Sequence, residues 1–110
     1  MTYQFQQSGG NGQLNLSGEL TVQYASELLA VLAEAQNSVT DLVVNLADVT
    51  EADVSCLQIL CAAHRSALRI QKSMALGKVS PEFRRAVEDT GYIRHMGCSR
   101  GTGQNCLWPA

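Results

Sequence analysis

The sequence lacks the features that mark nucleic-acid-binding proteins. It has 8 lysines and arginines against 10 aspartates and glutamates, a formal net charge of −2, and one local basic pair, Arg84 and Arg85. Recognition of phosphates needs a basic patch or stripe. Aromatic residues make up only 5% of the chain, which leaves few rings for base stacking. We therefore expect no nucleic-acid partner.

Long apolar runs are also missing. No stretch approaches the ~20 residues that a helix needs to cross a bilayer. Residues 1–13 have neither the positive region nor the apolar core of a signal peptide. We expect a cytoplasmic protein without membrane insertion, whose four cysteines are thiols or metal ligands rather than disulfides.

Catalytic motifs are absent as well. The sequence contains no Walker loop, no dinucleotide fingerprint and no nucleophile-elbow pattern. The glycine-rich segment 97–103 neither follows a clear strand nor opens a helix. We expect a protein that is not an enzyme and uses no cofactor.

The hydrophobic pattern predicts strands that alternate with helices. Strands are expected at 2–6, 13–16, 41–46 and 73–76, and helices after Thr21, after Asp53 and after Ser80. The first two strands form a hairpin through the turn at 8–12, and residues 17–20 end the second strand. The apolar run 41–46 is typical of a strand covered on both sides. This order predicts an α/β sandwich, with helices packed on a mainly parallel mixed sheet of about four strands.

Residues 42–65 carry the clearest functional signal. An apolar run gives way to a polar turn, and Asp53 and Ser55 stand where an amphipathic helix begins. The backbone N–H groups at a helix start are free and the dipole is positive there. Asp53 can cap this helix, and a phosphate on a nearby serine would be held by the same groups. The segment is therefore predicted to be a docking point or a switch.

Four segments, in order and with similar spacing, resemble the STAS domain family, which includes bacterial anti-sigma factor antagonists. They are Leu-Ser-Gly-Glu-Leu at 16–20, Leu-Val-Val-Asn-Leu at 42–46, Val-Thr-Glu-Ala-Asp-Val-Ser at 49–55, and Val-Ser-Pro-Glu-Phe-Arg-Arg at 79–85 with Thr-Gly at 90–91. The similarity spans about residues 3–95 of a single domain expected over 1–110, and leaves 96–110 as a divergent tail that contains cysteine.

The resemblance implies a non-enzymatic binding module of bacterial signalling. The implied partner is a histidine-kinase-like ATPase, such as an anti-sigma factor or a chemotaxis-type signalling protein. In the family, that partner phosphorylates a Ser or Thr just after the loop Asp, and the added charge abolishes binding. The docking surface implied for this chain is the loop and helix start at 49–56.

The chain departs from the family at this switch. The family pattern is Asp-Ser-Ser/Thr-Gly, whereas this chain has Asp53-Val54-Ser55-Cys56. Val54 stands at the acceptor position without a hydroxyl, and Cys56 replaces the Gly that lets a partner's backbone come close. Either Ser55 is phosphorylated instead, or the domain binds constitutively. We favour the second, because a shift of one residue turns a side chain by about 100° around the helix axis.

Two other functions stay open. STAS domains also occur as accessory subunits of lipid or anion transporters, where they tend to lack a phosphorylated serine, and Val54 is compatible with that role. A thiol or metal sensor would use His95, Cys98 and Cys106, but a structural zinc site normally has four ligands.

One further pair of metal-ligand residues lies on the helix after Asp53. Cys61 and His64 share a helix face and could reach one metal ion. That face is also the apolar stripe, with Leu57, Leu60 and Leu68. We therefore expect Cys61 and His64 in the core.

Overall fold

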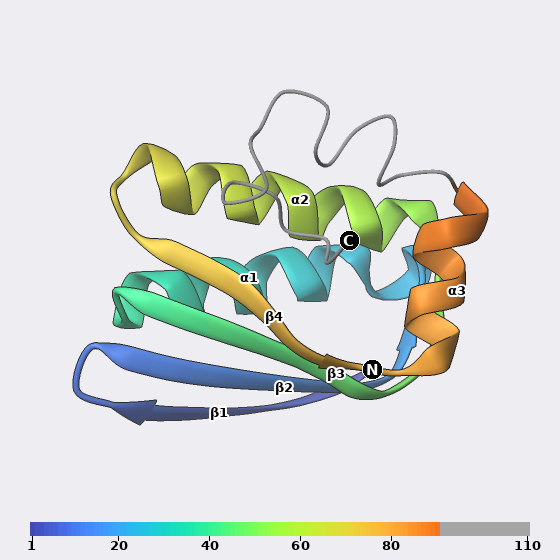
Figure 1. Cartoon of the computed structure of the whole chain (residues 1–110), viewed down its shortest axis with the longest axis horizontal. Coiled ribbons are helices and arrows are strands. Elements are labelled where there is room, and N and C mark those ends of the chain that lie inside the picture. The colour runs from blue at the N-terminus through green and yellow to red at the C-terminus, as the bar shows by residue number, and fades with distance from the viewer. Residues whose placement is uncertain (91–110) are drawn as a thin grey trace.

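The computed structural model describes residues 1–90, which form one sheet with helices on one face and at one end (Figure 1). The elements are β1 (Thr2–Ser8), β2 (Asn11–Leu20), the 3₁₀ turn η1 (Val22–Tyr24), α1 (Ala25–Ser38), β3 (Asp41–Ala52), α2 (Val54–Arg69), β4 (Ser73–Val79) and α3 (Pro81–Thr90). The predicted order of strands and helices is confirmed. No helix within residues 1–90 has the length and apolar character needed to span a membrane.

The four strands lie side by side in the order β1-β2-β3-β4. The β1–β2 hairpin is antiparallel, and Gly9 at its turn has a φ of +60°. Both other strand pairs are parallel. The prediction of a mainly parallel mixed sheet is therefore confirmed, and the carboxyl ends of β2, β3 and β4 lie at the same edge.

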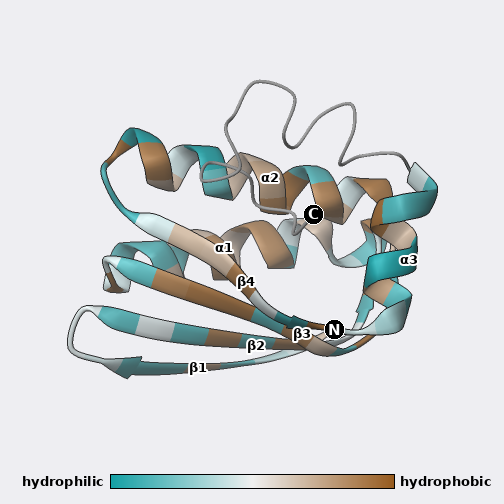
Figure 2. Ribbon diagram, in the orientation of Figure 1, coloured by the Kyte–Doolittle hydropathy of each residue, from teal (hydrophilic) through white to brown (hydrophobic). Residues whose placement is uncertain are grey.

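The core lies between the sheet and the two helices α1 and α2 that cover it. It is built mainly from leucine and valine, with Leu14, Leu16, Leu20, Leu42, Val44 and Leu46 from the strands and Leu28, Leu32, Leu57 and Leu60 from the helices. Figure 2 shows this concentration of hydrophobic residues in the central strands and the helices above them, whereas β1 is largely hydrophilic. Each fully buried aliphatic side chain contributes roughly 1.5–3 kcal/mol.

The other face of the sheet, called the open face below, has no helix over it within residues 1–90 (Figure 1). Along β3 buried residues alternate with less buried ones, so the prediction that 41–46 is covered on both sides is wrong. Asn45, in the middle of that apolar run, points to the open face. Its Nδ2 donates to Asn15 Oδ1 at 2.8 Å, and its Oδ1 accepts from the Lys78 N–H at 3.4 Å. Asn45 therefore links β3 to both neighbouring strands.

Two strands are longer than predicted. Residues 17–20 do not break β2, because the strand continues to Leu20 with bulges, and Gly18 there has a φ of +85°. β3 continues to Ala52, and its residue Val49 pairs with Gly18. The predicted loop at 49–56 is therefore the end of β3, the residue Asp53 and the first turn of α2.

The helix boundaries agree better with the sequence. Ser80 caps α3 as predicted, because its Oγ accepts the Phe83 N–H at 3.0 Å. Thr21 precedes the turn η1 rather than α1, and its side chain makes no capping hydrogen bond. On α2, Leu68 is 41% exposed, contrary to the prediction, because Ala67 fills the inward position of the last turn.

Candidate functional site

The starts of the helices and the carboxyl ends of the parallel strands meet at one end of the molecule, on the right in Figure 1. Two backbone hydrogen bonds join the residues before α2 and α3 to the neighbouring strands at this end. Asp53 N–H donates to Leu20 O at 3.1 Å, and Ser80 N–H donates to Leu46 O at 3.0 Å. In open α/β sheets, binding sites form outside the carboxyl ends of the strands. This end is therefore the candidate site.

Asp53 holds two helix starts together with one carboxylate. Its Oδ1 accepts the Cys56 N–H of α2 at 3.4 Å, which confirms the predicted cap. Its Oδ2 accepts the Val22 N–H at 2.9 Å, at the start of η1 and α1. These two hydrogen bonds satisfy N–H groups that helix ends otherwise leave free. They also fix the first turns of the two helical segments relative to each other.

Cys56 supports this arrangement from inside. Its side chain is fully buried, and the thiol donates to Thr21 O at 3.5 Å. Burial, and then the nearby Asp53 carboxylate, raise the pKa of the Cys56 thiol to about 11. The thiol is therefore protonated at neutral pH and acts as a hydrogen-bond donor. The sequence predicted Cys56 as part of the docking surface, but its side chain is buried and does not reach that surface.

Two exposed valines are neighbours of Asp53, one through the chain and one through a hydrogen bond. Val54 is the first residue of α2 and is 43% exposed, and Val22, bound through its N–H, is 67% exposed. Ser55 is half-buried, and its hydroxyl has no hydrogen-bond partner within the part of the chain that the structure describes. Exposed apolar side chains beside a fixed helix start can pack against another protein.

Sequence reasoning missed the contribution of Val22. It lies 31 residues before Asp53, and no local motif connects the two. The two residues are close because β2 and β3 are parallel and Leu20 pairs with Ala52. This pairing brings together the residues that follow each strand. Only the pairing of β2 with β3 could have revealed this neighbour.

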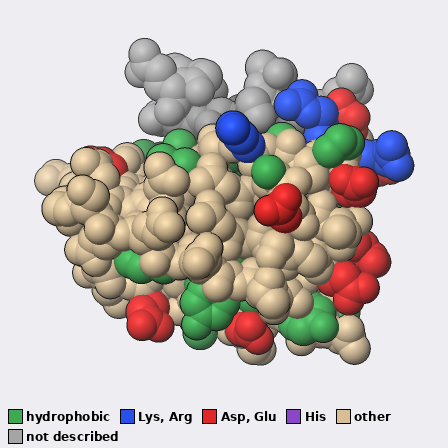
Figure 3. Space-filling view, turned by 90° about the horizontal axis from the view of Figure 1, so that it is seen from below, with side chains coloured by type: hydrophobic (Ala, Val, Ile, Leu, Met, Phe, Trp, Pro, Cys, Tyr) green, Lys and Arg blue, Asp and Glu red, His purple; other side chains and the backbone are tan. Residues whose placement is uncertain are grey.

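The strand ends beside these valines are acidic. Glu19 and Glu51 pair in the register of β2 and β3, and both are exposed. Within residues 1–90, neither carboxylate has an ion-pair partner. Seen from the open face of the sheet, several Asp and Glu side chains lie toward this end, with Lys and Arg side chains also present there (Figure 3). The site therefore combines an apolar pair with a negatively charged rim.

Cys61 and His64 lie in the core, as predicted. Both are buried, and Arg65 Nη1 donates to Cys61 Sγ at 3.2 Å. Burial, and then the Arg65 guanidinium, lower the pKa of His64. Within residues 1–90, no three side chains of the ligand types are placed to hold a metal ion. The other predicted candidates, His95, Cys98 and Cys106, lie outside the described residues, so the thiol or metal sensor stays a prediction.

The sequence matches a family model described as "Mlab, STAS domain" over residues 3–94. The chain belongs to the STAS domain family. The match includes the whole candidate site of this STAS domain and every helix found within residues 1–90. No curated protein matches the sequence.

Solved structures share the fold of this STAS domain. An anti-sigma factor antagonist from Mycobacterium paratuberculosis is 24% identical, over 84% of this chain and 80% of its own, with a TM-score of 0.70. The antagonist SpoIIAA in its unphosphorylated form is 20% identical, over 79% of this chain and 82% of its own, with a TM-score of 0.64. The Bacillus cell fate determinant SpoIIAA in its phosphorylated form is 20% identical, over 82% and 84%, with a TM-score of 0.64.

Proposed function

We propose that this STAS domain is a protein-binding module of bacterial signalling, similar in role to an anti-sigma factor antagonist. Its docking surface is the segment 49–56, with Val54 at the centre and Asp53 holding the helix start. The observation that carries the proposal is the exposed Val54 side chain on a first turn fixed by two hydrogen bonds to Asp53. A preformed surface binds a partner with little loss of conformational entropy.

The proposed partner is a histidine-kinase-like ATPase, such as an anti-sigma factor or a chemotaxis-type protein. The likeness in fold to structures described as anti-sigma factor antagonists supports this choice. The domain binds this ATPase without catalysing a reaction itself. Its docking requires no cofactor.

We propose further that binding is constitutive. Val54 has no hydroxyl, and the neighbouring Ser55 is half-buried at the first turn of α2. A phosphate on Ser55 would add nearly two negative charges two residues from the Asp53 carboxylate, and the like charges would repel each other. Neither position 54 nor position 55 therefore offers the exposed hydroxyl that the family's phosphorylation switch uses.

Capture of partners from the native cell tests the docking surface. Tagged full-length protein is compared with Val54→Gln, and with Ala62→Gln as the matched control two turns along α2. We expect the wild type and Ala62→Gln to retain a kinase-like ATPase, identified by mass spectrometry, and Val54→Gln to lose it. Glutamine has a higher helix propensity than valine, so the fold is kept. Equal capture by all three proteins would overturn the docking assignment.

The switch is tested separately with the captured ATPase and ATP. We expect no phosphate on the protein by intact mass spectrometry, and we expect Ser55→Ala to bind the ATPase as tightly as the wild type. A phosphate that is added to the wild type and is missing from Ser55→Ala would contradict constitutive binding. It would make Ser55 the acceptor.

A second candidate is an accessory subunit of a lipid or anion transporter. The observation that favours it is Val54, because a valine at the acceptor position suits a STAS domain that is not switched by phosphate. The same capture experiment distinguishes the two functions. Recovery of a membrane permease or its ATPase, dependent on Val54, would assign the domain to transport instead of signalling.

A further inference from the structure

We infer that the docking surface selects a protein partner with an apolar centre and a rim of lysine or arginine. This inference rests on the proposed function and adds two determinants to it. One is Val22, which lies outside the predicted docking segment. The other is the pair Glu19 and Glu51 at the ends of β2 and β3.

The apolar centre consists of Val22 and Val54. Both side chains are exposed, at 67% and 43%, and each lies within two residues of the end of a strand of the parallel pair β2 and β3. The two residues are held close together, because Asp53 precedes Val54 in the chain and accepts the Val22 N–H at 2.9 Å. Apolar side chains at the centre of an interface, inside a polar rim, are the usual source of binding energy.

The rim contains two adjacent glutamates. Glu19 and Glu51 are neighbours in the parallel register, and Asp53 N–H donates to Leu20 O directly beside them. Within residues 1–90, no cation pairs with either glutamate. Like charges on adjacent strands oppose each other. A cationic group of a partner would remove this repulsion and would be attracted over about a Debye length.

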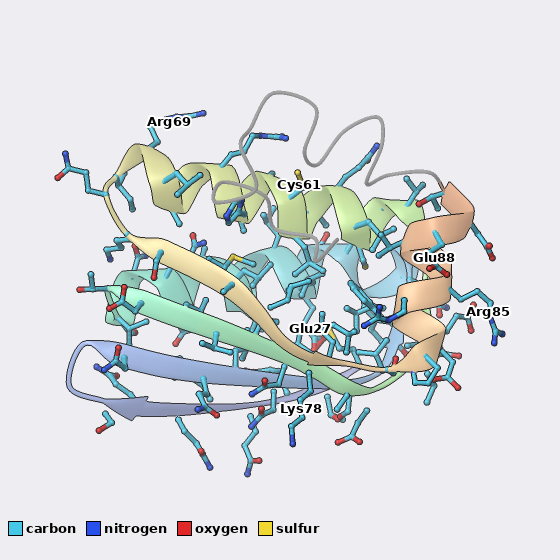
Figure 4. All side chains as sticks on the ribbon, viewed as in Figure 1. Glu27, Cys61, Arg69, Lys78, Arg85 and Glu88 are labelled. Carbon is cyan, nitrogen blue, oxygen red and sulfur yellow. The ribbon has the colours of Figure 1, made fainter. Side chains whose placement is uncertain are left out.

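Lys78 on β4 and Arg84 and Arg85 on α3 lie toward the same end, but within residues 1–90 no basic side chain forms an ion pair with Glu19 or Glu51. Arg69 lies at the far end of α2, and Arg85 and Glu88 project from α3 (Figure 4). In the described chain, Arg65 donates to Cys61 Sγ and Lys72 donates to Gln36 O at 2.6 Å, so both are directed to other parts of the protein.

The helix starts do not favour an anion at this surface. Asp53 already occupies the Val22 and Cys56 N–H groups, and Ser80 occupies the Phe83 N–H. A phosphate or an anionic lipid surface would be repelled by the Asp53 carboxylate and by the two glutamates. A basic protein surface is therefore the occupant that matches both the charge and the exposed valines.

Two synthetic peptides test this chemistry without the natural partner. Both are amphipathic helices with the same leucine face, and one carries lysine where the other carries glutamate. Each is titrated into the full-length ¹⁵N-labelled protein. We expect the lysine peptide to shift the backbone amides of Val22, Glu51 and Val54, with an affinity that falls as salt is added. We expect the glutamate peptide to leave these amides unchanged.

Matched variants assign the effect to the named residues. The double variant Glu19→Gln, Glu51→Gln should bind the lysine peptide about three- to tenfold more weakly than the wild type does. Val22→Gln should weaken this binding by a similar factor. Glu34→Gln on the far part of α1 and Ile70→Ser at the end of α2 should bind like the wild type. Equal binding of both peptides, binding at other amides, or an equal loss in Glu34→Gln would overturn the inference.

The outcomes separate this inference from the proposed function. If the captured ATPase depends on Val54 but is insensitive to salt and to the glutamate double variant, docking stands and the charge selectivity is wrong. If the lysine peptide binds as expected but no partner capture depends on Val54, the surface chemistry stands and the signalling role is wrong.

Discussion

Asp53 is the residue on which the geometry of the site depends. Its two oxygens accept N–H groups from the starts of two helical segments, and its own N–H donates to Leu20 O. A docking role for its side chain is therefore secondary, because both oxygens are already engaged within the protein. Asp53 positions Val22 and Val54 within the proposed docking surface.

Replacing Asp53 should destabilise the fold. Asp53→Ala leaves the Val22 and Cys56 N–H groups without their acceptor, and loss of an N-cap typically costs about 0.5–2 kcal/mol. We expect the free energy of unfolding in urea to fall by about 1–2 kcal/mol. Asp48→Ala, at an exposed strand position, should change it by less than about 0.5 kcal/mol. Equal stability of the Asp53 variant and the wild type would contradict the capping role.

His64 makes stability dependent on pH. Its burial, and then Arg65, lower its pKa from the ordinary 6.5, so the folded state favours the neutral imidazole. The stabilisation is fully present above the ordinary pKa and is lost as the pH falls below it toward the folded-state pKa.

We therefore expect the free energy of unfolding to decrease between about pH 7 and pH 5, with a smaller decrease in His64→Leu. Urea unfolding at several pH values measures both proteins. Identical slopes in the wild type and the variant would show that His64 is not the group responsible.

Among the elements, β4 pairs with β3 along the parallel ladder, and one close side-chain contact lies between them at Gly77. A Cβ at position 77 would overlap Asn45 Oδ1, so only glycine leaves room for the Asn45 side chain. Gly77→Ala should displace Asn45 from Asn15 and from Lys78, at a cost of about 1–3 kcal/mol.

The matched control is Gly10→Ala, where the nearest atom to an added Cβ is Thr40 Oγ1 at 3.7 Å. Thermal unfolding of both variants measures the difference. A melting temperature lowered equally in both would contradict a specific role of Gly77.

The starts of α2 and α3 could be predicted from the sequence because their signals are local. Ser80 before Pro81, and Asp53 before the apolar stripe, each supply an acceptor to an N–H within three residues. The strand ends could not be predicted, because residues 17–20 and 49–52 are held by each other across the sheet.

The directions in which the side chains of the candidate site point could not be predicted from the sequence either. Four consecutive residues, 53–56, were expected to form one docking surface. In the structure Val54 points outward and Cys56 inward, and which residue faces the core depends on where Asp53 ends the strand and caps the helix. Val22 joins this surface through pairing between distant strands, which no local pattern contains.

At the scale of the whole molecule, one face of the sheet buries the core and one end carries the site. The helices α1 and α2 lie on the same face, so their starts come side by side at the carboxyl ends of the strands (Figure 1). Asp53 and Cys56, at the start of α2, are hydrogen-bonded to Val22 and Thr21 in the segment after β2. Under the proposed function, this surface is formed before a partner binds.

The affinity of the captured ATPase for purified variants tests this account most directly. Isothermal titration compares the wild type, Val54→Gln and the control Ala62→Gln, after circular dichroism has shown that all three are folded. We predict a dissociation constant raised about tenfold or more for Val54→Gln and unchanged for Ala62→Gln, because an unpaired amide is costly to bury at an apolar contact. An unchanged dissociation constant for Val54→Gln would contradict docking at the start of α2.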